Sequence, residues 1–299
     1  MRQLVFAAVA LFAGASLAFW AITRPQTLPT GAFAGLEGDA DRGGLVFHAA
    51  GCASCHWATG ATGATGAAQQ LLSGGQEFAS DFGTFVAPNI SSDPVHGIGA
   101  WSAEDLGNAL LHGVSPGGAH YYPALPYWSY ARMEPQDVVD LHAYLEGIPA
   151  DATPSQPHRL VFPFGIRRLV GGWKWLHASQ DFVVQGDLTA QELRGRYLAE
   201  ALGHCGECHT PRTGTGGLDT GRWLAGAPNP SGQGTIPNIT PAKLTWSEAE
   251  IVEYLTSGFT PDYDSAGGHM AHVVENLARL PASDRQAIAA YLKRVPAVE

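Results

Sequence analysis

The feature that most constrains this sequence is an internal duplication, because the two halves match at a nearly constant offset. Five landmarks recur in the same order, at offsets between 145 and 153 residues. The pairs are Arg42-Gly43 and Arg194-Gly195, Cys52 and Cys205, Pro88-Asn89-Ile90 and Pro237-Asn238-Ile239, Trp101-Ser102 and Trp246-Ser247, and Ala143-Tyr144-Leu145 and Ala290-Tyr291-Leu292. The shared order predicts a duplicated domain, and 299 residues suffice for two domains of ordinary size.

Each half is predicted to be helical. Ser102 and Ser247 are each followed three residues later by an acidic residue, the capping-box pattern that opens a helix, and Gly113 and Gly258 stand where such a helix would end. The apolar side chains near the end of each half recur with helical spacing, and strand-like alternation is scarce. With 37 Gly and 20 Pro in the chain, each helical unit must also contain long loops.

Composition excludes two broad classes of protein. The chain has 17 Lys and Arg against 27 Asp and Glu, a net charge of −10, which argues against nucleic acid as a partner. Its four cysteines fall in two close pairs, so a disulfide-stapled scaffold is not indicated.

The cysteine pairs belong to the motif Cys-x-x-Cys-His, which occurs once in each half. It comprises Cys52, Cys55 and His56 in the first half, and Cys205, Cys208 and His209 in the second. Two thiols at this spacing can each form a thioether with one vinyl group of a haem, and the adjoining imidazole can then coordinate the iron. A zinc site or a redox-active dithiol would also use paired cysteines, but neither predicts a histidine after both pairs. We therefore predict two covalently bound haem c groups.

The opposite axial position on each iron has one methionine candidate per half. The chain contains only Met1, Met133 and Met270. Met133 and Met270 each follow the Cys-x-x-Cys-His motif of their half and the predicted helix that begins after its Trp-Ser pair. We therefore predict that they are iron ligands. Histidine competitors are His96, His112, His120 and His142 in the first half, and His269 and His272 in the second.

An uncharged run from Leu4 to Ile22 opens the chain. As a helix its nineteen residues would be about 28 Å long, enough to cross the hydrocarbon core of a membrane. Residues 1–24 are therefore expected to be a signal peptide or an uncleaved transmembrane anchor, and we favour the anchor because apolar residues continue past the passable cleavage sites. Either form implies export of the remaining chain.

From Asp39 onward the sequence resembles the cytochrome c subunits of membrane-bound bacterial dehydrogenases for alcohols, gluconate and aldehydes, and the related dihaem cytochromes. Besides the two Cys-x-x-Cys-His motifs, the resemblance is carried by residues 82–91, 121–133, 203–212 and 267–281. It implies that Met133 and Met270 supply the sixth iron ligand. Alcohol and gluconate dehydrogenase subunits typically carry three haem motifs, whereas this chain has two.

The expected fold is all-α, with two tandem class I-like cytochrome c domains preceded by the N-terminal helix. The expected segments are a linker at 25–38, domain 1 at 39–150, an interdomain linker at 151–187 and domain 2 at 188–299. Basic and aromatic residues between the repeats could bind a partner or the membrane surface, but a linker packed across both domains is the preferred interpretation.

The expected function is electron transfer rather than enzyme catalysis, either as a separate carrier or as the electron-accepting subunit of a dehydrogenase complex. A dihaem carrier on the periplasmic side of the cytoplasmic membrane would accept single electrons from a periplasmic dehydrogenase. It would pass them to quinone, another cytochrome or a terminal oxidase. The alternative is a dihaem cytochrome c peroxidase, which needs one iron with an open site. A methionine in each half counts against that alternative.

Overall fold

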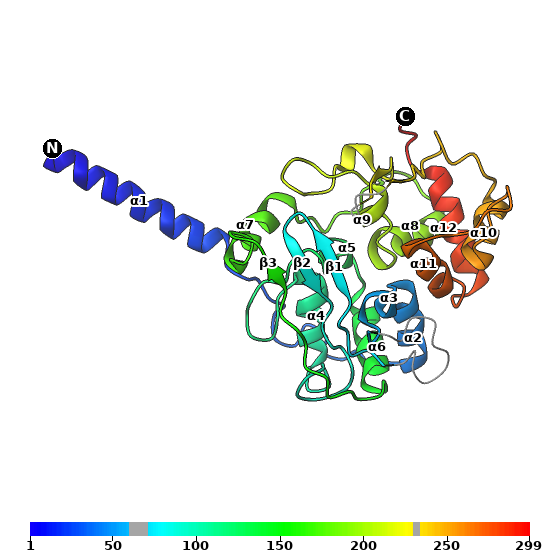
Figure 1. Cartoon of the computed structure of the whole chain (residues 1–299), viewed down its shortest axis with the longest axis horizontal. Helices are drawn as coiled ribbons and strands as arrows, with labels where there is room; N and C mark the ends of the chain where they lie inside the picture. Colours follow the sequence, from blue (N-terminus) through cyan, green and yellow to red (C-terminus); the bar gives the residue numbers. More distant parts are fainter. Residues whose placement is uncertain (60–70, 230–233) are drawn as a thin grey trace.

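The computed structural model describes residues 1–59, 71–229 and 234–299. A long N-terminal helix, α1 (Arg2–Ile22), extends away from a helical body that contains the remaining elements (Figure 1). The helices of the first half are α2 (Ala40–Ala49), α3 (Cys52–His56), α4 (Ala103–His112), α5 (Tyr127–Tyr130) and α6 (Pro135–Glu146). After α7 (Arg167–His177), the second half contains α8 (Ala190–Arg196), the π-helical turn η2 (Tyr197–Leu202), α9 (Gly206–His209), the 3-10 turn η3 (Thr220–Arg222), α10 (Glu248–Ser257), α11 (His269–Leu277) and α12 (Ala282–Arg294).

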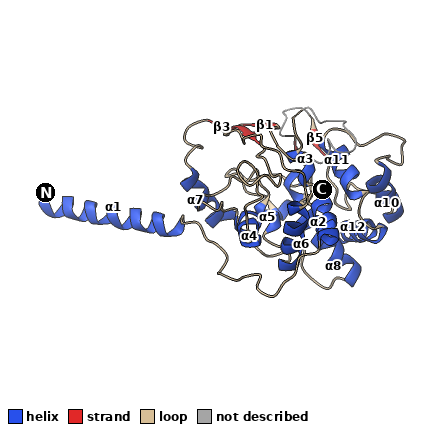
Figure 2. Cartoon of the chain, turned by 90° about the horizontal axis from the view of Figure 1, so that it is seen from below, coloured by secondary structure: helices blue, strands red, loops and turns tan. Residues whose placement is uncertain are grey.

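The expectation of an all-α chain is only partly confirmed: the described residues are mostly helical, but they also form two small antiparallel sheets (Figure 2). The first sheet has the order β1 (Glu77–Ser80), β2 (Gly83–Val86) and β3 (Arg159–Leu160), and the second pairs β4 (Ala227–Pro228) with β5 (Thr235–Ile236). These strands have two to four residues. Segments this short offer too few positions for an alternating pattern to be recognised in the sequence.

The predicted helix starts and ends are confirmed. Ser102 and Ser247 both form complete capping boxes, immediately before the first residues of α4 and α10. Gly113 and Gly258 follow these helices with φ angles of 58° and 80°, the left-handed conformation that favours glycine.

In each half the first and last helices cross in close contact at a glycine, and we call this contact the glycine crossing. A Cβ atom at Gly43 in α2 would collide with the backbone carbonyl of Asp140 in α6, and one at Gly195 in α8 would collide with the carbonyl of Ala287 in α12. In the first half, Arg42 reinforces the crossing by donating from Nε and Nη2 to both carboxylate oxygens of Asp140, at 2.7 and 2.8 Å. Both halves therefore repeat the same close helix contact.

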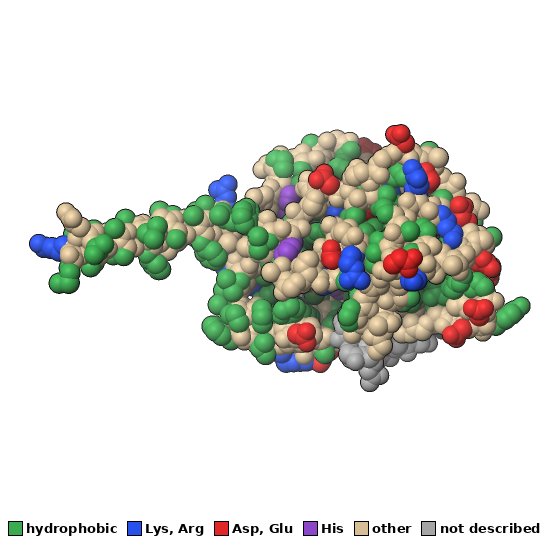
Figure 3. Space-filling view, turned by 90° about the horizontal axis from the view of Figure 1, so that it is seen from above, with side chains coloured by type: hydrophobic (Ala, Val, Ile, Leu, Met, Phe, Trp, Pro, Cys, Tyr) green, Lys and Arg blue, Asp and Glu red, His purple; other side chains and the backbone are tan. Residues whose placement is uncertain are grey.

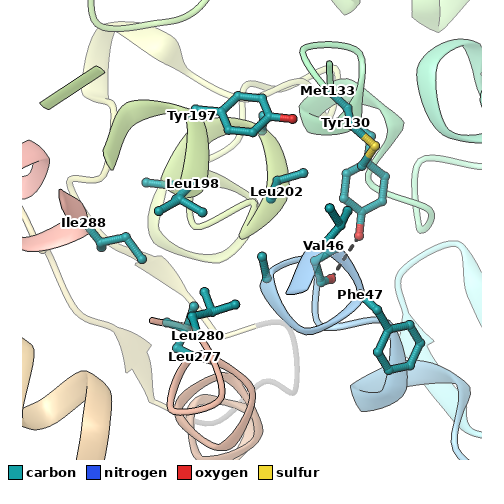
Figure 4. Close-up of a cluster of buried hydrophobic side chains, with 14 of the residues drawn as sticks. Val46, Phe47, Tyr130, Met133, Tyr197, Leu198, Leu202, Leu277, Leu280 and Ile288 are labelled. Carbon is teal, nitrogen blue, oxygen red and sulfur yellow. Dashed lines mark hydrogen bonds between the residues drawn. The ribbon is translucent and has the colours of Figure 1, made fainter. Parts of the chain in front are cut away.

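The hydrophobic core is continuous between the two halves, with members from α2, α5, η2, α11 and α12. Figure 4 shows Tyr130 and Met133 of the first half near Tyr197 and Leu202 of η2. At this boundary the backbone N–H of Glu134 donates to the Tyr197 hydroxyl at 3.0 Å, and that hydroxyl donates to Asp137. The halves therefore share packing and hydrogen bonds.

Helix α1 has no buried residue and a mean hydropathy of 2.2, so it is long and apolar enough to cross a membrane. The chain after it turns back onto the first half. Thr23 and Phe33 are buried, and the backbone N–H of Leu28 donates to Asn108 at 2.7 Å. Residues 25–38 form no helix or strand, but they lie against the folded body through these contacts.

Candidate functional site

The two Cys-x-x-Cys-His motifs form the short helices α3 and α9. Each helix is preceded by a residue with positive φ, Gly51 at 61° and His204 at 39°, so the chain turns sharply before the first cysteine. Cys55 and Cys208 are exposed, whereas Cys52 and Cys205 are partly buried. None of the four is in a disulfide, which leaves their sulfur atoms available for attachment to a cofactor.

The histidine of each motif makes the same hydrogen bond. His56 Nδ1 lies 2.8 Å from the carbonyl oxygen of Pro88, and His209 Nδ1 lies 2.8 Å from that of Pro237. Because a carbonyl only accepts, Nδ1 carries the proton and Nε2 keeps its lone pair. Burial lowers the pKa of both histidines, which favours the neutral imidazole. Both side chains are therefore in the form that can ligate a metal through Nε2, with the supporting hydrogen bond on Nδ1 already made.

The two proline carbonyls lie in loops that are held by the asparagine next in sequence. Asn89 donates from Nδ2 to the backbone carbonyls of Asp151 and Thr153, both at 2.8 Å. Asn238 donates to the carbonyl of Val298, also at 2.8 Å. The repeated Pro-Asn-Ile tripeptide therefore fixes the histidine of its own half, a role that the sequence analysis did not assign to it.

The two motifs lie close together across the boundary between the halves. The carbonyl oxygen of Ala50, two residues before Cys52, is 3.1 Å from the Tyr130 hydroxyl and 3.3 Å from His204 Nε2. The surrounding protein and then the nearby Cys208 raise the pKa of the Cys55 thiol to about 11. Two groups attached to these motifs would therefore be neighbours.

Helix α11 of the second half also contacts the first motif. Asn276 in α11 donates from Nδ2 to the Ser54 hydroxyl at 3.1 Å, and its Oδ1 lies 3.2 Å from His48 Nδ1. The rings of Trp57 and His272 meet edge to face with centroids 5.5 Å apart. These contacts place the helix that carries Met270 against α3.

The two candidate methionines lie in the shared core. Met133 is buried at 4% exposure, directly after the turn that follows α5, and Met270 is partly buried in the first turn of α11.

Two of the histidines that compete with these methionines make hydrogen bonds elsewhere. Both ring nitrogens of His120 have partners, Thr23 O at 2.9 Å and Lys174 Nζ at 3.1 Å, and His142 Nε2 lies 2.8 Å from Trp101 O.

The remaining competitors are placed as follows. The His272 Nδ1 atom lies 3.3 Å from a carboxylate oxygen of Glu275, and the His269 ring lies near Phe78 with centroids 6.4 Å apart. The His96 Nδ1 atom lies 3.4 Å from Asp93. His112 ends α4, and its carbonyl accepts a hydrogen bond from Lys174.

The alternatives of a zinc site and a redox dithiol find no support in this geometry. Among the described residues, no group of three His, Cys, Asp or Glu side chains is arranged to hold a metal ion. Reactive dithiols need a lowered thiol pKa. Here burial raises the pKa of Cys52 and of Cys205 to about 12.

Comparison with known proteins agrees with this site. Residues 40–149 match the cytochrome c family. The chain is 58% identical to a diheme cytochrome c-type protein of Cereibacter sphaeroides over the full length of both chains. It is 39% identical to the fructose dehydrogenase cytochrome subunit of Gluconobacter japonicus, covering 86% of this chain and 52% of that one. It is 34% identical to the gluconate 2-dehydrogenase cytochrome c subunit of Pantoea cypripedii, covering 86% of this chain and 59% of that one.

The chain therefore belongs to the c-type cytochromes, the electron-transfer proteins that carry covalent haem. Within them it belongs with the dihaem members related to dehydrogenase cytochrome subunits, so the prediction of two haem c groups is confirmed. It spans only a little over half the length of the fructose and gluconate dehydrogenase subunits.

Proposed function

We propose that this chain is a membrane-anchored dihaem electron carrier. It would accept single electrons from a periplasmic dehydrogenase and pass them to quinone, another cytochrome or a terminal oxidase. The observation that carries the proposal is the pair of identical histidine-to-proline hydrogen bonds, one beside each Cys-x-x-Cys pair. The names of the relatives support a dehydrogenase as donor, and they do not favour the peroxidase alternative.

The chain is proposed to consist of two tandem cytochrome c domains, at 39–150 and 188–299, joined by 151–187. The family match covers the first of them. The second repeats the capping box, the glycine crossing and the histidine-to-proline bond of the first. These shared details support the same fold and the same cofactor site in both halves.

Each haem would be attached through the two cysteines of its half and ligated by the histidine that follows them. The pairs are Cys52 and Cys55 with His56, and Cys205 and Cys208 with His209. When bound, haem iron supplies one-electron chemistry between the ferric and ferrous states. The chain contributes ligand orientation, because the Pro88 and Pro237 carbonyls fix the Nδ1–H of each imidazole.

Met133 and Met270 are proposed as the second axial ligands. Met133 supports this role by its burial in the hydrophobic core, and Met270 by packing against that core, where a thioether ligand is shielded from water. A thioether ligand raises the reduction potential relative to a second histidine, which suits a relay. A ligand at this position in both halves would also leave neither iron open to peroxide.

The optical spectrum of the ferric protein tests the ligand proposal. Methionine sulfur bound to ferric haem produces a weak long-wavelength band, and we expect its intensity to correspond to two haems per chain. Met133→Leu and Met270→Leu should each remove half of it, while the haem-to-chain ratio stays at two. A band that keeps its full intensity in one variant would show that the replaced methionine is not an iron ligand. Wild-type protein without the band would show that other side chains occupy these positions, with His272 the first to replace.

Electron transfer itself is tested by reducing the purified protein with a periplasmic dehydrogenase and its substrate. A carrier is reduced at both haems and reoxidised by an acceptor without consuming peroxide. Rapid peroxide turnover after partial reduction would instead support the peroxidase alternative.

A further inference from the structure

The end of helix α1 is fixed to the folded body by several contacts. Thr23, the residue after α1, is 1% exposed, and its carbonyl oxygen lies 2.9 Å from His120 Nε2. Arg168 in α7 donates from Nε to the Thr23 hydroxyl at 2.8 Å and from Nη2 to the carbonyl of Trp20. A Cβ atom at Gly171 in α7 would collide with the Thr23 carbonyl. Helix α7 therefore packs directly against the point where α1 enters the body (Figure 1).

The part of the body beside this junction exposes an unusual number of large apolar side chains, which we call the apolar collar. Its members are Val161 (53% exposed), Phe162 (88%), Phe164 (41%), Ile166 (45%), Leu169 (42%), Trp175 (67%) and Leu176 (62%). Figure 3 shows hydrophobic side chains gathered around the base of α1. Scattered exposed apolar residues are ordinary, but a contiguous group marks an interaction surface.

The segment that carries the collar is held against the body by specific contacts. Val170 and Gly171 face the body from α7, whereas Leu169, Trp175 and Leu176 face outward. Lys174 fixes the helix by donating to the carbonyls of His112 and Gly113, both at 2.7 Å. The preceding loop is held by the rings of Phe82 and Phe164, which meet edge to face with centroids 4.8 Å apart.

The charge around the collar differs from that of the rest of the chain. Residues 152–180 contain Arg159, Arg167, Arg168 and Lys174 and no Asp or Glu, although the whole chain carries a net charge of −10. An amphipathic helix with tryptophan on its apolar side and basic residues nearby is typical of a helix that lies in a membrane interface. Asp and Glu side chains appear mainly on the end of the body away from α1 (Figure 3).

We propose that the apolar collar lies in the headgroup region of the bilayer that α1 crosses, with lipid as its occupant. The proposal rests on the anchoring part of the proposed function. If α1 spans the hydrocarbon core, Thr23 leaves it at the interface, and α7, in contact with Thr23, must lie at the same depth. The collar would then hold the body against the membrane in one orientation instead of leaving it free on a tether.

Spin labels on the full-length holoprotein test this placement. Phe162→Cys and Leu176→Cys carry the label on the collar, and Tyr263→Cys is the matched control, because Tyr263 is 95% exposed in the loop before α11. The proteins are incorporated into vesicles of phosphatidylethanolamine and phosphatidylglycerol. Label collisions with oxygen, which concentrates in lipid, are compared with collisions with a water-soluble nickel chelate. We expect an oxygen-to-nickel ratio several-fold higher at 162 and 176 than at 263.

An alkaline carbonate wash separates failure of the collar from failure of the anchor. Protein that is retained but has water-exposed labels at 162 and 176 would overturn the collar and leave the anchor intact. The collar surface would then be free for a protein partner. Protein that the wash releases, but whose collar labels contact lipid beforehand, would support the collar as a peripheral surface and overturn the anchor. Release together with water-exposed labels would overturn both.

Discussion

The glycine crossing in the first half can be tested with two substitutions at adjacent positions. Gly43→Ala places a Cβ atom against the backbone carbonyl of Asp140 and the Cβ of Tyr144, neither of which can move without displacing helix α6. Gly44→Ala, one residue later in the same helix, meets only the edge of the Tyr144 ring, 3.2 Å away. The two variants make the same chemical change in α2 and differ only in what the new methyl group contacts.

The expected magnitudes follow from opposing terms. Replacing glycine by alanine inside a helix favours folding by roughly 0.8–1 kcal/mol at either position. At position 43, overpacking costs about 1–3 kcal/mol and in rigid surroundings more. Separating the helices also lengthens the hydrogen bonds between Arg42 and Asp140, although the exposed arginine limits that contribution. We expect Gly43→Ala to lower the free energy of unfolding by about 2 kcal/mol, and Gly44→Ala to leave it unchanged or raise it slightly.

Guanidinium chloride unfolding of the holoprotein, followed by circular dichroism, measures both variants against wild type. A shift in midpoint with an unchanged slope reports stability alone. Gly195→Ala, which meets the carbonyl of Ala287, should behave like Gly43→Ala. If Gly43→Ala proved as stable as Gly44→Ala, helices α2 and α6 would not be in close contact at Gly43.

Two further predictions concern the loops and the pH dependence of this crossing. Asn89→Ala should destabilise the protein by roughly 2–4 kcal/mol in a denaturant titration, because it removes two buried hydrogen bonds and leaves the Ser91 N–H without its acceptor. It should also shift the potential of one haem only, whereas Asn238→Ala, with one donated bond, should have a smaller effect on the other haem. Equal shifts at both haems would contradict this assignment. Burial alone would raise the pKa of Asp140. Hydrogen bonds from Arg42, the Asp39 N–H and Gln136 outweigh burial and lower this pKa below its ordinary value of 3.8. The ionised Asp140 carboxylate therefore contributes its full stabilisation above pH 3.8, and this contribution is lost as the pH falls through the lowered pKa. The stability advantage of wild type over Asp140→Asn should shrink in thermal melts between pH 5 and pH 2, and a constant difference would show that Asp140 is not ionised in the fold.

Much of this structure follows from local sequence patterns. Capping boxes, left-handed glycines and the Cys-x-x-Cys-His helices depend on residues a few positions apart, so the sequence displays them directly. The support for His56 and His209 could not be predicted in the same way, because the acceptors are backbone carbonyls, which every residue possesses. The one available signal was that Pro-Asn-Ile recurs in both halves. The packing of Phe33 against the body was equally hidden, since its partners lie far along the chain.

The two halves differ by a single residue in the stretch just before the Cys-x-x-Cys-His motif. Gly43 precedes Cys52 by nine positions, whereas Gly195 precedes Cys205 by ten. The structure accommodates the extra residue as the π-helical turn η2, in which the N–H of Gly203 donates to the carbonyl of Leu198, five residues back. Without that turn, one added residue would rotate everything after it by about 100° around the helix axis and move the second motif away from its own loop. The same turn carries Tyr197, which bonds to Glu134 and Asp137 of the first half. The turn therefore keeps the second motif beside its own loop, and it also carries a contact with the first half that a duplicated pair of independent domains would lack.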